Sequence, residues 1–100
     1  MPPASSIDVP VERIAQICKR YGIQELAIIG SAARGDFHPD SDVDVVVEFL
    51  PDVVYGWEYF RIERELAEAF GRPVDLSTKK WLKPRVRDRV LPEARVVYAA

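Results

Sequence analysis

Gly30-Ser31-Ala32-Ala33-Arg34-Gly35-Asp36-Phe37-His38-Pro39-Asp40-Ser41-Asp42-Val43-Asp44 is the stretch that decides the fold of this 100-residue chain. It follows a short apolar run, Leu26–Ile29, and leads into a second one, Val45–Val47. Short apolar runs bounded by turn-forming residues are typical of buried β-strands. The stretch therefore predicts a strand, a turn of small residues, a loop, and a second strand that begins with two carboxylates.

The turn after the first strand has the residues of a phosphate-binding site. Gly30 permits a sharp turn and lets another group approach the backbone closely. Ser31 is a suitable N-cap for a short helix that runs to Arg34, and free backbone N–H groups at such a helix start bind phosphate. We predict that Gly30 and Ser31 bind a phosphate. Arg34 either contacts the same phosphate or pairs with a nearby acid.

Asp42 and Asp44 form the second feature of the stretch. Side chains two residues apart on a strand point to the same face, so these two carboxylates repel each other unless a cation lies between them. Ligands that are all oxygen select a hard ion, Mg²⁺ above all where phosphates complete the coordination. A phosphate-binding turn beside a Mg²⁺ site is a layout for transfer from a nucleoside triphosphate.

A third carboxylate lies farther along the chain. Pro73–Ser77 reads as a short strand that carries Asp75. If this strand neighbours the second one, Asp75 joins Asp42 and Asp44. The spacing alone leaves this open. Glu48 shares the face of the aspartates, but it lies about 13 Å beyond Asp44 along an extended strand, too far to bind the same metal.

The pattern Gly-Ser, ten residues, Asp-x-Asp resembles the nucleotidyltransferase superfamily with the polymerase-beta-like fold. The fuller string Gly-Ser-x-Ala-Arg-Gly-Asp…Ser-Asp-x-Asp is similar to its minimal nucleotidyltransferase (MNT) branch, and the likeness covers the chain from about Val11 to Tyr98. The resemblance implies an α/β (α+β) fold, with a small mixed sheet and helices on one face. Many members of this branch are antitoxins to HEPN-domain toxins.

The resemblance also implies roles for the candidate residues. Asp42, Asp44 and Asp75 would be catalytic and would hold Mg²⁺, two ions in all. Gly30, Ser31 and Arg34 would bind ATP, whose AMP would pass to a tyrosine hydroxyl of a HEPN toxin that forms a complex with the chain. Two alternatives remain: an antitoxin that neutralises by binding alone, and a nucleotidyltransferase acting on small molecules, for which 100 residues leave little room.

Composition limits the other classes of function. The formal net charge is only −2, so we expect no direct nucleic-acid binding. No apolar run approaches the length of a membrane span and no basic-then-apolar leader opens the chain, which favours a cytoplasmic protein. We expect one domain over residues 1–100, with 1–7 as a flexible tail. Cys18, the single cysteine, is expected in the core. His38, the single histidine, is expected in an exposed loop.

The remaining pattern predicts scaffold. A first helix, with Asp8 as its N-cap and Pro10 in its first turn, is expected to end at Tyr21. Further helices are expected from Val53 or Val54 to Phe70 and from Trp81 to Val90, with a last strand or an extended tail over 94–98. Acidic residues predominate from Asp36 to Phe60, and basic residues predominate from Lys79 to Arg95. The basic stretch either faces phosphates or an acidic partner, or is a solvated helix surface. Trp57 and Phe60 are either exposed at a partner interface or packed.

Overall fold

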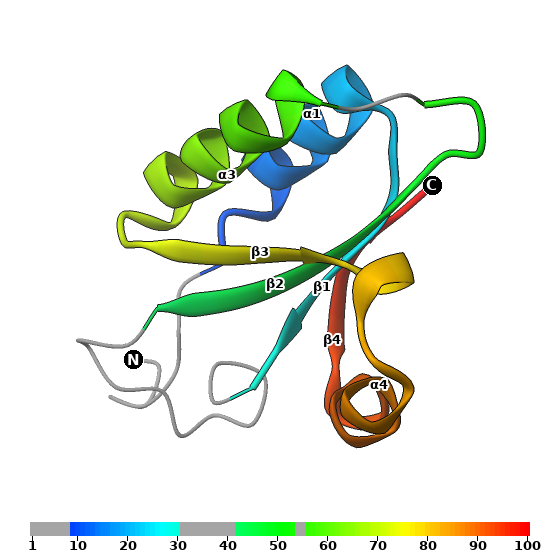
Figure 1. The fold of residues 1–100 in the computed structure, drawn as a ribbon. Coiled ribbons are helices and arrows are strands. Elements are labelled where there is room, and N and C mark those ends of the chain that lie inside the picture. Colours follow the sequence, from blue (N-terminus) through cyan, green and yellow to red (C-terminus); the bar gives the residue numbers. More distant parts are fainter. Residues whose placement is uncertain (1–8, 31–41, 54–55) are drawn as a thin grey trace.

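The structure, a computed structural model, describes residues 9–30, 42–53 and 56–100 (Figure 1). Ser31, Arg34 and His38, which the sequence analysis singled out, lie outside these ranges. The elements in chain order are α1 (Val11–Tyr21), β1 (Ile23–Ile29), β2 (Val43–Phe49), α3 (Trp57–Phe70), β3 (Val74–Thr78), the 3₁₀ turn η1 (Lys79–Trp81), α4 (Pro84–Val90), the 3₁₀ turn η2 (Leu91–Glu93) and β4 (Arg95–Ala99).

The described strands form one mixed sheet in the order β3-β2-β1-β4. β1 is antiparallel to both of its neighbours, β2 and β4, whereas β2 and β3 are parallel. A parallel pair needs a crossover connection, and α3 lies within the one between β2 and β3. The predicted α/β class with a small mixed sheet is confirmed.

One face of the sheet is covered by α1 and α3, which lie side by side across it (Figure 1). Alternate residues of β2 point to this face, and Val43, Val45 and Val47 are fully buried in the core. The intervening residues of β2, Asp44 and Glu48 among them, therefore point to the other face. The predicted arrangement, with helices on one face of the sheet, therefore leaves the carboxylates of β2 on the other face.

α1 packs through the apolar stripe that the sequence predicts. Ile14, Ile17 and Cys18 are buried, and Gly22 ends the helix in the left-handed conformation at φ +70°. The helix begins at Val11, and Asp8, the predicted N-cap, lies outside the described residues. Burial raises the pKa of the Cys18 thiol to about 12. A thiol that stays protonated is a poor nucleophile, so Cys18 is a core residue, as predicted.

α3 is the longest described helix, and it buries Ile62 and Leu66. It begins at Trp57, a turn later than predicted. Trp57 and Phe60 lie off the buried stripe, with 86% and 63% of their surfaces exposed. Of the two alternatives for these aromatic residues, the structure therefore shows exposure and not packing. In the described part of the chain no helix is long and apolar enough to cross a membrane.

The predicted helix from Trp81 to Val90 is wrong at its start. Residues Lys79–Trp81 form a 3₁₀ turn, and α4 begins at Pro84. The cause is local, because the α conformation is disfavoured for a residue that precedes a proline. Lys83 precedes Pro84 and is extended, at φ −63° and ψ 143°. α4 lies apart from α1 and α3 (Figure 1), buries none of its residues, and leaves Val86 42% exposed.

Candidate active site

The parallel pairing of β2 with β3 brings two of the predicted carboxylates together. Asp44 and Asp75 are register partners in adjacent strands, with Val43 opposite Val74 and Val45 opposite Leu76. The valines and Leu76 point to the helix-covered face and are buried. Asp44 and Asp75 therefore share the opposite face, and Asp42, two residues before Asp44, extends the cluster.

The pKa of the Asp44 carboxyl reflects the two other carboxylates. Burial raises the pKa of the Asp44 carboxyl above its usual value, and the charges of Asp75 and Asp42 raise it further. Asp42 and Asp75 are exposed, while Asp44 is half-buried between the strands. All of these causes raise the pKa of Asp44, and none of them is a nearby protein cation. Negative charge is therefore concentrated at this cluster.

Gly30 closes the site on the side of β1. Asp44 pairs with Ile29, the last residue of β1, so the turn at Gly30 follows directly beside the carboxylate. Gly30 has φ +72°, and a Cβ built on it would lie 2.9 Å from Oδ2 of Asp44. A side chain at position 30 would displace that carboxylate. Glycine is therefore favoured here by the backbone conformation, and it leaves Asp44 undisturbed at this close approach.

The three aspartates fit a divalent metal by their chemistry. They supply only carboxylate oxygens, the donors that Mg²⁺ prefers, and a cation would relieve the repulsion that raises the pKa of Asp44. Among the described residues, however, no three side chains are already gathered as a complete set of metal ligands. Mg²⁺ commonly keeps waters and substrate phosphates as ligands, so a partial protein set is the expected arrangement for this ion.

The sequence of residues 11–97 matches the protein-family model of the nucleotidyltransferase domain. The chain belongs to the nucleotidyltransferase family. The matched range runs from the first residue of α1 to the middle of β4, and it contains Gly30 and the three aspartates. The family predicted from the Gly-Ser and Asp-x-Asp pattern is confirmed.

Relatives place this nucleotidyltransferase in the minimal branch. The protein adenylyltransferase MntA of Thermococcus cleftensis is 35% identical over 85 residues, which cover 83% of this chain and 81% of the relative. A structure of a minimal nucleotidyltransferase is 33% identical, with a TM-score of 0.73 over 84% of this chain and 85% of that one.

A more distant structure shares the fold. A chain of the Shewanella oneidensis complex between an MNT antitoxin and a tri-AMPylated HEPN toxin is 16% identical, with a TM-score of 0.66 over 91% of this chain and 71% of that one. At this identity the likeness concerns the fold.

Glu48 of this nucleotidyltransferase stands apart from the aspartates, as its distance along β2 predicts. Its carboxylate lies 3.5 Å from Nζ of Lys79, which also lies 3.9 Å from Glu25. Sequence reasoning missed this ion-pair cluster, because the position of Lys79 depends on the 3₁₀ turn after β3. It also missed Thr78, which is 2% exposed and has a hydroxyl without a hydrogen-bond partner in the described part of the chain.

Proposed function

We propose that this chain is a Mg²⁺-dependent protein adenylyltransferase that transfers AMP from ATP to a tyrosine hydroxyl of a cognate HEPN toxin and thereby acts as its antitoxin. The observation that carries the proposal is the position of Asp44, between Asp75 on β3 and the Gly30 turn after β1. The name of the Thermococcus relative, a protein adenylyltransferase, supports it. The proposal includes a cytoplasmic location for the protein.

The reaction is an in-line displacement at the α-phosphorus of ATP. The bond from the acceptor oxygen to this phosphorus forms, the bond to the β-phosphate oxygen breaks, and pyrophosphate leaves. Gly30 and Ser31 would bind the β- and γ-phosphates, with Arg34 as a further contact. Asp75, the exposed member of the register pair, would help to remove the proton of the acceptor hydroxyl.

Asp42 and Asp44 would hold one Mg²⁺ with the triphosphate, and together with Asp75 they would hold a second. Such a pair of ions supplies neutralisation of charge on the attacking and leaving oxygens. The protein contributes the fixed spacing of the carboxylates, which the β2–β3 register imposes. The close approach of Gly30 keeps Asp44 against the turn that would bind the phosphates.

Labelled ATP tests the proposal against its two alternatives. The purified chain is mixed with ATP labelled at the α-phosphate, Mg²⁺ and a HEPN protein that co-purifies with it. Label on the HEPN protein, lost when its acceptor tyrosine is replaced by phenylalanine, is the expected result. A stable complex without label would indicate an antitoxin that acts by binding alone. Label only on added small molecules would indicate the third function.

A further inference from the structure

Three aromatic side chains are exposed where α3 lies beside the turn that follows β3. Trp57 on α3 is 86% exposed, and Phe60 on α3 and Trp81 on η1 are each 63% exposed. No other aromatic residue in the part of the chain that the structure describes is exposed. Soluble proteins rarely leave large apolar side chains together at the surface unless another molecule covers them. We call Trp57, Phe60 and Trp81 the aromatic surface.

The half-buried ring of Tyr59 joins the two elements of the aromatic surface. Its centroid lies 6.1 Å from that of Phe60, edge to face, and 5.9 Å from that of Trp81. Trp57 precedes Phe60 by three residues, so the two are neighbours on the surface of the helix. The exposed side chains therefore form one continuous surface that spans α3 and η1.

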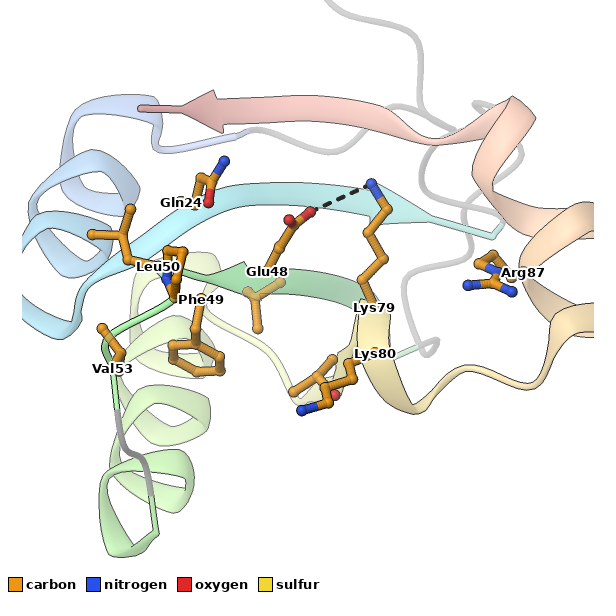
Figure 2. Close-up of a pocket in the computed structure, with 11 residues that line it drawn as sticks. Gln24, Glu48, Phe49, Leu50, Val53, Lys79, Lys80 and Arg87 are labelled. Atoms are coloured by element: carbon orange, nitrogen blue, oxygen red, sulfur yellow. Dashed lines mark ion pairs between the residues drawn. The ribbon is translucent and has the colours of Figure 1, made fainter.

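The aromatic surface is held in place by contacts within the chain. Lys79 belongs to the same 3₁₀ turn as Trp81, and its Nζ lies 3.5 Å from Glu48; Figure 2 shows it reaching over to this residue. From α3, the ring of Tyr59 contacts Trp81 and the hydroxyl of Tyr59 donates a hydrogen bond to the Leu76 carbonyl oxygen. A surface that is already ordered loses less entropy when a partner binds.

The charges beside the aromatic surface favour an acidic partner. Arg61 and Arg64 continue the exposed stripe of Trp57 and Phe60 along α3, and neither forms an ion pair with another described residue. Three of the four carboxylates of α3 are engaged elsewhere: Glu58 with the N–H of Gly56, Glu65 with Arg20, and Glu68 with Arg13. The two arginines are therefore available to carboxylates of another protein.

The position of the aromatic surface relates it to the candidate active site. β3 is an edge strand of the sheet, and the Tyr59 hydroxyl bonds to Leu76, the residue directly after Asp75. A protein that covers the neighbours of Tyr59 therefore lies next to the strand that carries Asp75. In the proposed function Asp75 helps to remove the proton of the acceptor hydroxyl, so a protein acceptor is needed at this edge.

We propose that the aromatic surface docks the HEPN toxin, through an apolar patch of the toxin rimmed by carboxylates, and so presents the acceptor tyrosine to Asp75. Tryptophan, tyrosine and arginine are the residues that most often dominate binding energy at interfaces. A second copy of this chain is less suited, because a symmetric dimer through α3 would bring Arg61 and Arg64 of both copies into one interface. The identity of the occupant rests on the proposed function.

Calorimetry between the purified chain and the HEPN protein of the transfer assay, without ATP, measures docking. The test variant is W57A/F60A. The matched control is V11A/V86A, which shortens two other exposed apolar side chains, on α1 and α4. We expect the Kd to rise at least about tenfold in W57A/F60A and to stay within about twofold in the control. Thermal unfolding verifies that both variants are folded.

A second pair of variants tests the arginines. R61E/R64E reverses both charges and should raise the Kd for the HEPN protein at least about tenfold, because it sets carboxylates against carboxylates. R61K/R64K keeps the charges and should stay within about threefold of the wild type. Equal affinity of R61E/R64E and the wild type would refute the acidic rim of the partner.

Transfer kinetics separate docking from chemistry. In W57A/F60A the KM for the HEPN protein should rise, whereas the KM for ATP and the kcat at saturating HEPN protein should match those of the wild type. A lower kcat with an unchanged KM for the HEPN protein would contradict a docking role.

Two further results would overturn the proposal. The first is a Kd for the HEPN protein that is equal in the wild type and W57A/F60A. The second is a dimer of this chain, seen by analytical ultracentrifugation, that W57A/F60A dissociates without a change in HEPN binding. Docking that requires Trp57 and Phe60 without transfer of label would keep this surface and refute the proposed function. Transfer by W57A/F60A with normal docking would do the reverse.

Discussion

At the scale of single residues, the site depends on one carboxylate that is costly to the fold. Asp44 is half-buried, and burial together with Asp75 and Asp42 raises its pKa. A carboxyl whose pKa is higher in the folded protein binds more protons there, so its contribution to stability falls as the pH rises through that range. Near neutral pH the ionised Asp44 therefore destabilises the metal-free fold.

Replacing this carboxylate separates its two effects. We expect D44N to lower the rate of transfer at least about a hundredfold, because a metal contact contributes several kcal/mol in the transition state. The same variant should raise the Tm of the metal-free protein at pH 7, and this advantage should disappear at a pH where Asp44 is protonated. Transfer assays and thermal unfolding at the two pH values measure both effects. Normal transfer by D44N would refute the proposed role of Asp44.

Gly30 gives a second prediction at this scale, with an internal control in Gly71. Both have φ +72°, but a Cβ on Gly30 would lie 2.9 Å from Asp44 Oδ2, whereas one on Gly71 would meet nothing within 4 Å. G30A and G71A should each lose about 1–2 kcal/mol of unfolding free energy through the backbone conformation. Only G30A should lose transfer activity beyond that, in kinetics at a temperature where both variants are folded. Equal activity in the two variants would show that the close approach is unimportant.

At the scale of elements, the local patterns were readable and the long-range ones were not. The stripe Ile14–Cys18 and the left-handed Gly22 follow from neighbours in sequence, so α1 was predicted closely. The pairing of Asp44 with Asp75 depends on the crossover through α3, which spacing alone left open. The unpartnered hydroxyl of Thr78 and the ion pair of Lys79 with Glu48 depend on where β3 ends. The sequence pattern does not fix that position.

The contact between α3 and β3 yields a prediction for these elements. The Tyr59 hydroxyl donates a hydrogen bond to the Leu76 carbonyl oxygen at 2.5 Å, and the ring centroid of Tyr59 lies 5.9 Å from that of Trp81. Y59F keeps the ring and leaves the carbonyl without this donor, so the free energy of unfolding should fall by about 1 kcal/mol. Denaturant unfolding measures it, with W57F as the control at a highly exposed aromatic position. An unchanged value for Y59F would mean that water replaces the hydroxyl at no cost.

At the scale of the whole molecule, the two faces of the sheet have separate tasks. The face under α1 and α3 holds the core, and the opposite face carries the aspartates at the start of β2 and the ion pair between Glu48 and Lys79 towards its end. α4 buries none of its residues, so it contributes charge and surface more than stability. A small domain has a small margin of stability, and a ligand that joins neighbouring strands can therefore change it measurably.

Metal binding should appear as a property of the whole fold. An ion held by Asp42, Asp44 and Asp75 joins β2 to β3, and at a concentration a hundredfold above its Kd it stabilises the folded state by about 2.7 kcal/mol. For a domain of this size, that is a rise in Tm on the order of 10 °C. We expect Mg²⁺ to give this rise in the wild type and in D88N, which removes an exposed carboxylate from α4, but not in D44N or D75N. An equal rise in all four proteins would place the ion elsewhere and would remove the metal from the proposed mechanism.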